Sequence, residues 1–84
     1  MKFAAFALAG SSALEDPSVI YKRMVEFAQE AELLGYDSVW FAEHHFSRVG
    51  MCPDALMVAL AIAQKTKKIR VGTAISIVPF HNPI

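Results

Sequence analysis

The chain has 84 residues, eight acidic and eight basic side chains, and a hydrophobic content of 55%. A neutral balance gives no reason to expect nucleic acid or an anionic membrane surface as a partner. No apolar stretch approaches the roughly 20 residues of a membrane span. The single cysteine, Cys52, excludes an internal disulfide and is typical of a reducing compartment. We therefore expect a cytoplasmic globular protein in which Cys52 is a buried structural residue.

Residues 3–9 are a continuous apolar run that Gly10 ends. A very short secretory signal would look similar, but its charged region would be Lys2 alone and its length would be at the lower limit of about 7–15 residues. We interpret the run as a strand buried on both faces.

A helix is predicted next, because Asp16 is a good N-cap and Pro17 suits the first helical position. Its apolar stripe consists of Ile20, Met24, Phe27, Ala31 and Leu34. Gly35 stands where a left-handed residue would end it.

The second half of the chain repeats this pattern. Residues 38–42 read as a second buried strand, and Pro53 and Asp54 open a second helix that ends around residues 66–68. We expect the inner stripe of that helix to be Leu56, Ala59, Leu60 and Ala63. Residues 69–78 then form a third strand, interrupted at Gly72 and Thr73 and closed by Pro79.

Alternating apolar strands and helices predict an α/β fold with a parallel sheet and right-handed crossovers. A parallel sheet must be covered on both faces or closed into a barrel. A complete (β/α)8 barrel takes about 250 residues. The order β-α-β-α-β over residues 1–84 therefore predicts one incomplete domain, the N-terminal portion of such a barrel, and we expect the end at Ile84 to be a truncation.

The polar cluster Glu43, His44 and His45 follows the second strand. Active sites of βα-barrels lie at the carboxyl ends of the strands, and a carboxylate with two imidazoles can transfer protons near neutral pH. The cluster could also bind a metal or only line a solvated loop. Adjacent side chains of an extended chain point in opposite directions, so a metal site would need His81 as well. We expect no metal.

A second candidate region lies on the third strand. Gly72, Thr73 and Ala74 are small residues at the expected barrel mouth, where they could let a flat ligand ring approach the backbone. Ordinary packing of the barrel interior explains the same pattern.

Two motifs resemble a known family. Residues 35–46, Gly-Tyr-Asp-Ser-Val-Trp-Phe-Ala-Glu-His-His-Phe, resemble the second-strand signature of the luciferase-like flavin monooxygenases. Residues 70–74 and 79–83 resemble that family's third strand and following loop, and residues 1–3 also fit. The resemblance covers nearly the whole chain and implies a (β/α)8 barrel.

The resemblance also implies a function. Members of the family bind reduced FMN, which reacts with O2 to oxidise an organic substrate, an aldehyde in luciferases. It implies that His44 is the catalytic acid/base, that Glu43 and His45 support it, and that Phe6 lines the flavin pocket. It further implies a non-proline cis peptide between Ala74 and Ile75 beneath the flavin ring.

Because most of a barrel would lie outside these residues, we expect the 84-residue chain to be inactive by itself. Two alternatives remain open. One is a fragment of a deazaflavin (F420)-dependent oxidoreductase on the same barrel. The other is a non-catalytic assembly piece that associates through open sheet edges.

Overall fold

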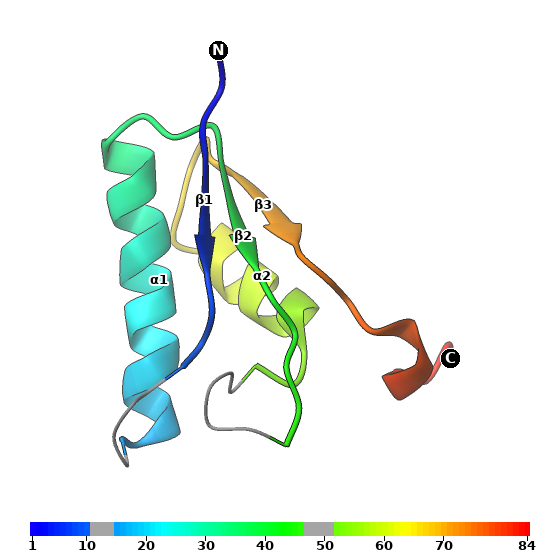
Figure 1. Ribbon diagram of the computed structural model, residues 1–84. Helices are drawn as coiled ribbons and strands as arrows, with labels where there is room; N and C mark the ends of the chain where they lie inside the picture. Colours follow the sequence, from blue (N-terminus) through cyan, green and yellow to red (C-terminus); the bar gives the residue numbers. More distant parts are fainter. Residues whose placement is uncertain (11–14, 47–51) are drawn as a thin grey trace.

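The computed structural model describes residues 1–10, 15–46 and 52–84. The elements in chain order are β1 (Ala4–Ala7), α1 (Pro17–Leu33), β2 (Ser38–Phe41), α2 (Ala55–Ala63), β3 (Arg70–Thr73) and the 3-10 turn η1 (Val78–Phe80). The three strands form one parallel sheet in the order β1-β2-β3. Figure 1 shows the strands running in the same direction, and along the chain α1 connects β1 to β2 and α2 connects β2 to β3. The predicted parallel βαβαβ arrangement is confirmed.

The predicted helix signals act as expected at three positions. The Asp16 carboxylate accepts a hydrogen bond of 2.8 Å from the Ser18 amide at the start of α1. The Asp54 carboxylate accepts from the amides of Leu56 and Met57, at 2.9 and 3.3 Å, at the start of α2. Gly35 has φ = 85° just after α1, a conformation that glycine adopts without steric cost.

The core lies between the sheet and the two helices. Its buried members are Ala9, Ile20, Met24, Ala28, Ala31, Val39, Phe41, Cys52, Ala55, Val58 and Ile62. Phe41 is the largest fully buried side chain, and its ring meets that of Phe27 edge to face at 6.3 Å. Cys52 is free and buried, as predicted.

The prediction that the strands are buried on both faces is wrong. Val39 and Phe41 of β2 are fully buried on the helix side, whereas Trp40 is 40% exposed and Phe6 of β1 is 56% exposed. The helices cover one face of the sheet, and no other described residue covers the opposite face. Phe6 and Trp40 are paired in register on that face, which we call the open face.

The predicted stripes of the helices need correction. In α1 the predicted Ile20, Met24 and Ala31 are buried, but the fourth buried residue is Ala28, while Phe27 and Leu34 are exposed. In α2 the residues against the core are Ala55, Val58 and Ile62. The expected stripe of Leu56, Ala59, Leu60 and Ala63 lies on other sides of α2 and is largely exposed. All nine residues of α2 are apolar, so its sequence contains no polar face from which the buried side could be inferred.

Three elements are several residues shorter than expected, and β2 ends one residue early, at Phe41. The first strand covers Ala4–Ala7, α2 ends at Ala63, and β3 covers Arg70–Thr73 rather than residues 69–78. The segment after β3 turns in η1, where the Phe80 amide donates to the Ile77 carbonyl at 3.0 Å. No helix in the described ranges is both long enough and apolar enough to span a bilayer.

Candidate functional site

The candidate site begins where β2 ends, at the carboxyl edge of the sheet. Two backbone hydrogen bonds continue the pairing of β2 with the segment after β3. The Ala74 amide donates to the Phe41 carbonyl at 2.8 Å, and the Glu43 amide donates to the Ile75 carbonyl at 3.2 Å. The fold therefore brings the expected flavin contacts Ala74 and Ile75 next to the end of β2.

The Glu43 side chain is fully buried and accepts hydrogen bonds from three groups. Nε2 of His45 lies 2.7 Å from Oε1. Nε2 of His81 lies 2.9 Å from Oε1 and 2.8 Å from Oε2. The backbone amide of Ile77 donates to Oε2 at 3.1 Å. Glu43 is thus a junction between the end of β2 and the segment that follows β3.

These donors determine the ionisation state of Glu43. Burial raises the pKa of the carboxyl, but the hydrogen bonds from His45, His81 and Ile77 outweigh it and lower the pKa to about 2. The hydrogen bond to Glu43 in turn raises the pKa of His81 against the effect of desolvation. Glu43 is therefore a buried anion at neutral pH, and the charged form of His81 is stabilised beside it.

His44 points away from this junction. Its ring is exposed and has no hydrogen-bond partner among the described residues, while its backbone amide donates to the Cys52 carbonyl at 2.8 Å. Neighbouring side chains of an extended chain face opposite ways, and Glu43 and His45 share one side here. Glu43 contacts His45 rather than the ring of His44, and the His45 ring also lies 4.6 Å from that of Phe80.

The role of His81 was missed from the sequence, which suggested it only as a possible third metal ligand. The available signal was that His81 is the only histidine besides His44 and His45, and that it follows the neighbouring strand. Among the described residues, no cluster of His, Cys, Asp and Glu has the arrangement of a metal site.

The open face places Phe6, Trp40 and Gly72 in one row across the three strands. The indole of Trp40 occupies the space beside Gly72, where a β-carbon would lie 2.6 Å from ring atom Cε3. At Gly72, packing against Trp40 therefore explains the small residue. Ala74, two positions further along, is exposed.

The expected cis peptide between Ala74 and Ile75 is not found, because every described peptide bond is trans. A non-proline cis bond persists only where the surrounding structure enforces it. Ala74 and Ile75 are both exposed in this chain, so no described residue packs against them tightly enough to enforce one.

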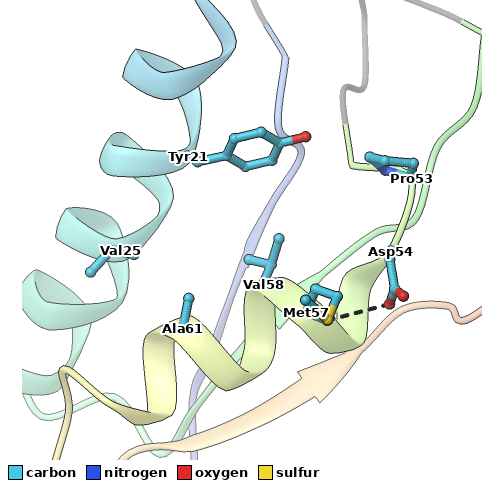
Figure 2. A pocket seen from close by; sticks show the side chains of 7 residues that line it. All are labelled: Tyr21, Val25, Pro53, Asp54, Met57, Val58 and Ala61. Atoms are coloured by element: carbon cyan, nitrogen blue, oxygen red, sulfur yellow. Dashed lines mark hydrogen bonds between the residues drawn. The ribbon is translucent and has the colours of Figure 1, made fainter.

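A separate groove of about 330 Å³ lies between the two helices. Figure 2 shows its lining, formed by Tyr21, Val25, Pro53, Asp54, Met57, Val58 and Ala61. The lining is mostly apolar, and the Asp54 carboxylate in it is already bonded to the start of α2. The groove contains none of the residues expected in the site.

Comparison with known proteins identifies the family. The sequence profile of the luciferase-like monooxygenases matches residues 1–84. The chain belongs to this family. It is similar to the alkanal monooxygenase alpha chain of the Kryptophanaron alfredi symbiont, with 34% identity over 84 residues, which are all of this chain and 24% of that protein.

Two further proteins extend the comparison. The oxygenase component of the flavin-dependent trigonelline monooxygenase of Acinetobacter baylyi is 34% identical over 65 residues, 77% of this chain and 18% of its own length. The FMN complex of the oxygenating constituent of 3,6-diketocamphane monooxygenase from Pseudomonas putida matches with a TM-score of 0.90 at 19% identity, over 99% of this chain and 23% of its own.

The luciferase-like chain thus spans about a quarter of the length of the relatives it matches. The likeness to the FMN complex establishes the fold. The three strands and two helices of the present chain correspond to the N-terminal portion of the family's (β/α)8 barrel.

Proposed function

We propose that this chain is the N-terminal part, a single domain segment of residues 1–84, of a cytoplasmic FMNH2-dependent monooxygenase. It would use O2 to oxidise a small, aldehyde-like organic substrate. The observation that carries this proposal is the family match over residues 1–84, which includes the acid/base cluster at the end of β2. The names of the relatives, an alkanal monooxygenase and a flavin-dependent oxygenase, support the substrate and the cofactor.

In this function His44 is the catalytic acid/base. Its ring is exposed, none of the described side chains engages it, and it follows Trp40 of the open face by four positions. An imidazole with this freedom can exchange a proton with a bound substrate or cofactor. Glu43 and His45 act from the other side of the chain by holding the backbone that carries His44.

The open face suits a flat, largely apolar ring. Phe6, Ala74 and Ile75 are exposed there or just beyond it, and they would contact the flavin and exclude water from it. The bound reduced flavin supplies the electrons that activate O2. The protein residues bind it, orient it and provide the proton.

We expect the 84-residue chain by itself to bind FMN weakly and to have no turnover, because it spans about a quarter of its relatives. It should also self-associate. Large apolar side chains of α2, Leu56, Met57 and Leu60, and Phe6 of the open face are exposed, and contiguous apolar surface promotes association. Fluorescence titration with FMN and sedimentation velocity test both points. Submicromolar FMN binding by a stable monomer would contradict them.

The function is tested in the full-length protein by the change His44→Ala. Turnover with FMNH2, O2 and an alkanal should fall roughly 10²–10⁴-fold, the usual contribution of a general acid/base, with little loss of FMN affinity. Lys22→Ala, an exposed position of α1, is the matched control and should leave turnover unchanged. Activity with reduced F420 but not with FMNH2 would refute the proposal in favour of a deazaflavin enzyme.

A further inference from the structure

The buried Glu43 junction contains one group that the proposed chemistry does not use, His81. An ionised carboxylate only accepts hydrogen bonds. Both imidazoles at Glu43 must therefore carry hydrogen on Nε2, His45 at 2.7 Å and His81 at 2.8 Å. The tautomers are thereby determined by the carboxylate, and both rings are held in one orientation.

The junction connects two segments that are far apart in the sequence. His45 belongs to the segment after β2, whereas His81, 38 residues from Glu43, belongs to the segment after β3. On the backbone, Glu43 is bonded to the Ile75 carbonyl at 3.2 Å, and His44 is bonded to the Cys52 carbonyl at 2.8 Å. His44, the proposed acid/base, therefore follows Glu43 directly in the chain, and Ile75, a proposed flavin contact, is hydrogen-bonded to the Glu43 backbone.

His81 also faces the start of α2. Its second ring nitrogen, Nδ1, lies 4.0 Å from Oδ2 of Asp54, the N-cap of that helix. The charged or titratable groups near the ring are therefore Glu43 at the end of β2, His45 beside the same carboxylate, and Asp54 at the start of α2. Two of these are anions, so the charged imidazolium is favoured between them.

We propose that His81 is a positioning residue. Its ring, held between Glu43 and Asp54, fixes the segment after β3 against the segment that carries His44, so that the acid/base and the peptide at Ala74 and Ile75 keep their separation. The expected effect of His81 on catalysis rests on the proposed function. Its expected effect on the order of the segment that carries His44 is independent of that function.

The arrangement has a consequence for pH. The pKa of His81 is raised by Glu43, so its charged form is complete below the ordinary value of 6.5 and is lost as pH rises through the raised value. The Glu43 carboxylate is ionised throughout this range, since its pKa is about 2. The attraction between His81 and Glu43 should therefore weaken as pH rises through the raised pKa of His81. The Nε2 hydrogen of neutral His81 still donates to Glu43.

The experiment compares His81→Ala and His81→Gln in the full-length protein, with Asn82→Ala as the control at the exposed neighbouring position. His81→Ala should lower kcat roughly tenfold to a hundredfold, the scale of a small misplacement of reacting groups, with KM nearly unchanged. His81→Gln, which keeps a donor but no charge, should recover most of kcat and should lack the alkaline decline that we expect for the wild-type protein. A His81→Ala protein with the wild-type kcat and pH profile would overturn the proposal.

Amide hydrogen exchange supplies a measurement that does not need activity. The His44 amide is bonded to Cys52, and it should exchange at least tenfold faster in His81→Ala while the Val39 amide of β2 keeps its wild-type rate. Unchanged exchange at His44 would contradict the positioning role. If His81→Ala does not fold, His81→Gln is compared with wild type below pH 6.5, where only wild type carries the charge; faster exchange of the His44 amide in His81→Gln is expected, and equal exchange would contradict the proposal. Failure of the proposed function would instead appear as a wild-type protein without flavin-dependent turnover but with the exchange effect intact.

Discussion

The indole ring of Trp40 fills the place that a side chain at position 72 would need. A β-carbon on Gly72 would lie 2.6 Å from Cε3, 2.7 Å from Cζ3 and 2.8 Å from Cδ2 of Trp40. The ring is also tied by its Nε1 hydrogen to the Ser38 hydroxyl at 2.9 Å. Because β2 and β3 are paired with Trp40 opposite Gly72, the indole can lie across the neighbouring strand.

Gly72→Ala should therefore destabilise the protein by about 1–3 kcal/mol, the usual cost of inserting a group into occupied space. Urea unfolding measures the loss. The control is the same change in a Trp40→Val background, where the smaller side chain frees the space. An equal cost in both backgrounds would show that the contact with Trp40 is not its cause.

The two faces of the sheet should respond differently to loss of an aromatic ring. Phe41 is fully buried, so Phe41→Ala should cost about 3–5 kcal/mol. Phe6 is 56% exposed on the open face, so Phe6→Ala should cost well under half as much. Urea unfolding of both variants of the 84-residue chain, at a concentration low enough to keep it monomeric, makes the comparison. Similar losses would mean that the open face is covered in solution.

Glu32 of α1 stabilises the turn before β3. Its carboxylate accepts from the backbone amides of Lys67, Lys68 and Ile69 at 2.7–3.2 Å. Glu32→Gln should accelerate hydrogen exchange at these three amides, whereas Glu30→Gln, an exposed position of the same helix, should not. No acceleration in Glu32→Gln would refute this role.

The same bonds make the contribution of Glu32 dependent on pH. They lower its pKa from the usual 4.5, Ile69 and Lys68 most strongly. A carboxyl with a lowered pKa in the folded state stabilises above its unfolded value and loses that effect as pH falls through the lowered value. The exchange difference between wild type and Glu32→Gln should therefore shrink below about pH 4.5.

Glu43 should show the larger acid effect, because its pKa is lowered from 4.5 to about 2. The free energy of unfolding of wild type should exceed that of Glu43→Gln by a constant amount between about pH 5 and the ordinary histidine pKa of 6.5, and the difference should decline as pH falls toward 2. Urea unfolding at unit steps of pH measures it. A difference that does not change between pH 5 and pH 2 would mean that Glu43 is not ionised in the folded protein.

Local signals in the sequence predicted the helix starts and the first helix end correctly. Asp16 and Asp54 bond to amides two or three residues away, and Gly35 adopts its own positive φ. Such features depend on a few consecutive residues, so they can be recognised without the fold. The buried side of α2 could not be recognised from the sequence, because all of its residues are apolar and only the packing against the rest of the fold decides which side faces the core.

The candidate site was also only partly predictable from the sequence. The position of Glu43, His44 and His45 at a strand end follows from the order of elements, but the identity of their partners does not. The sequence cannot indicate that Glu43 bonds to His81 rather than to His44, because that pairing spans 38 residues and depends on how far the segment after β3 turns back. The trans bond at Ala74 and Ile75 likewise differs from what the family resemblance implied.

From the sequence alone one can infer that this chain alternates strands and helices, resembles the luciferase-like monooxygenases, and has the cluster Glu43, His44 and His45 after its second strand, because periodicity, caps and motifs are local. The fold was needed to show which side of each strand and helix is buried and which residues surround Trp40 and Glu43. Those outcomes depend on the strand register and on hydrogen bonds between distant segments, which form only when the sheet does.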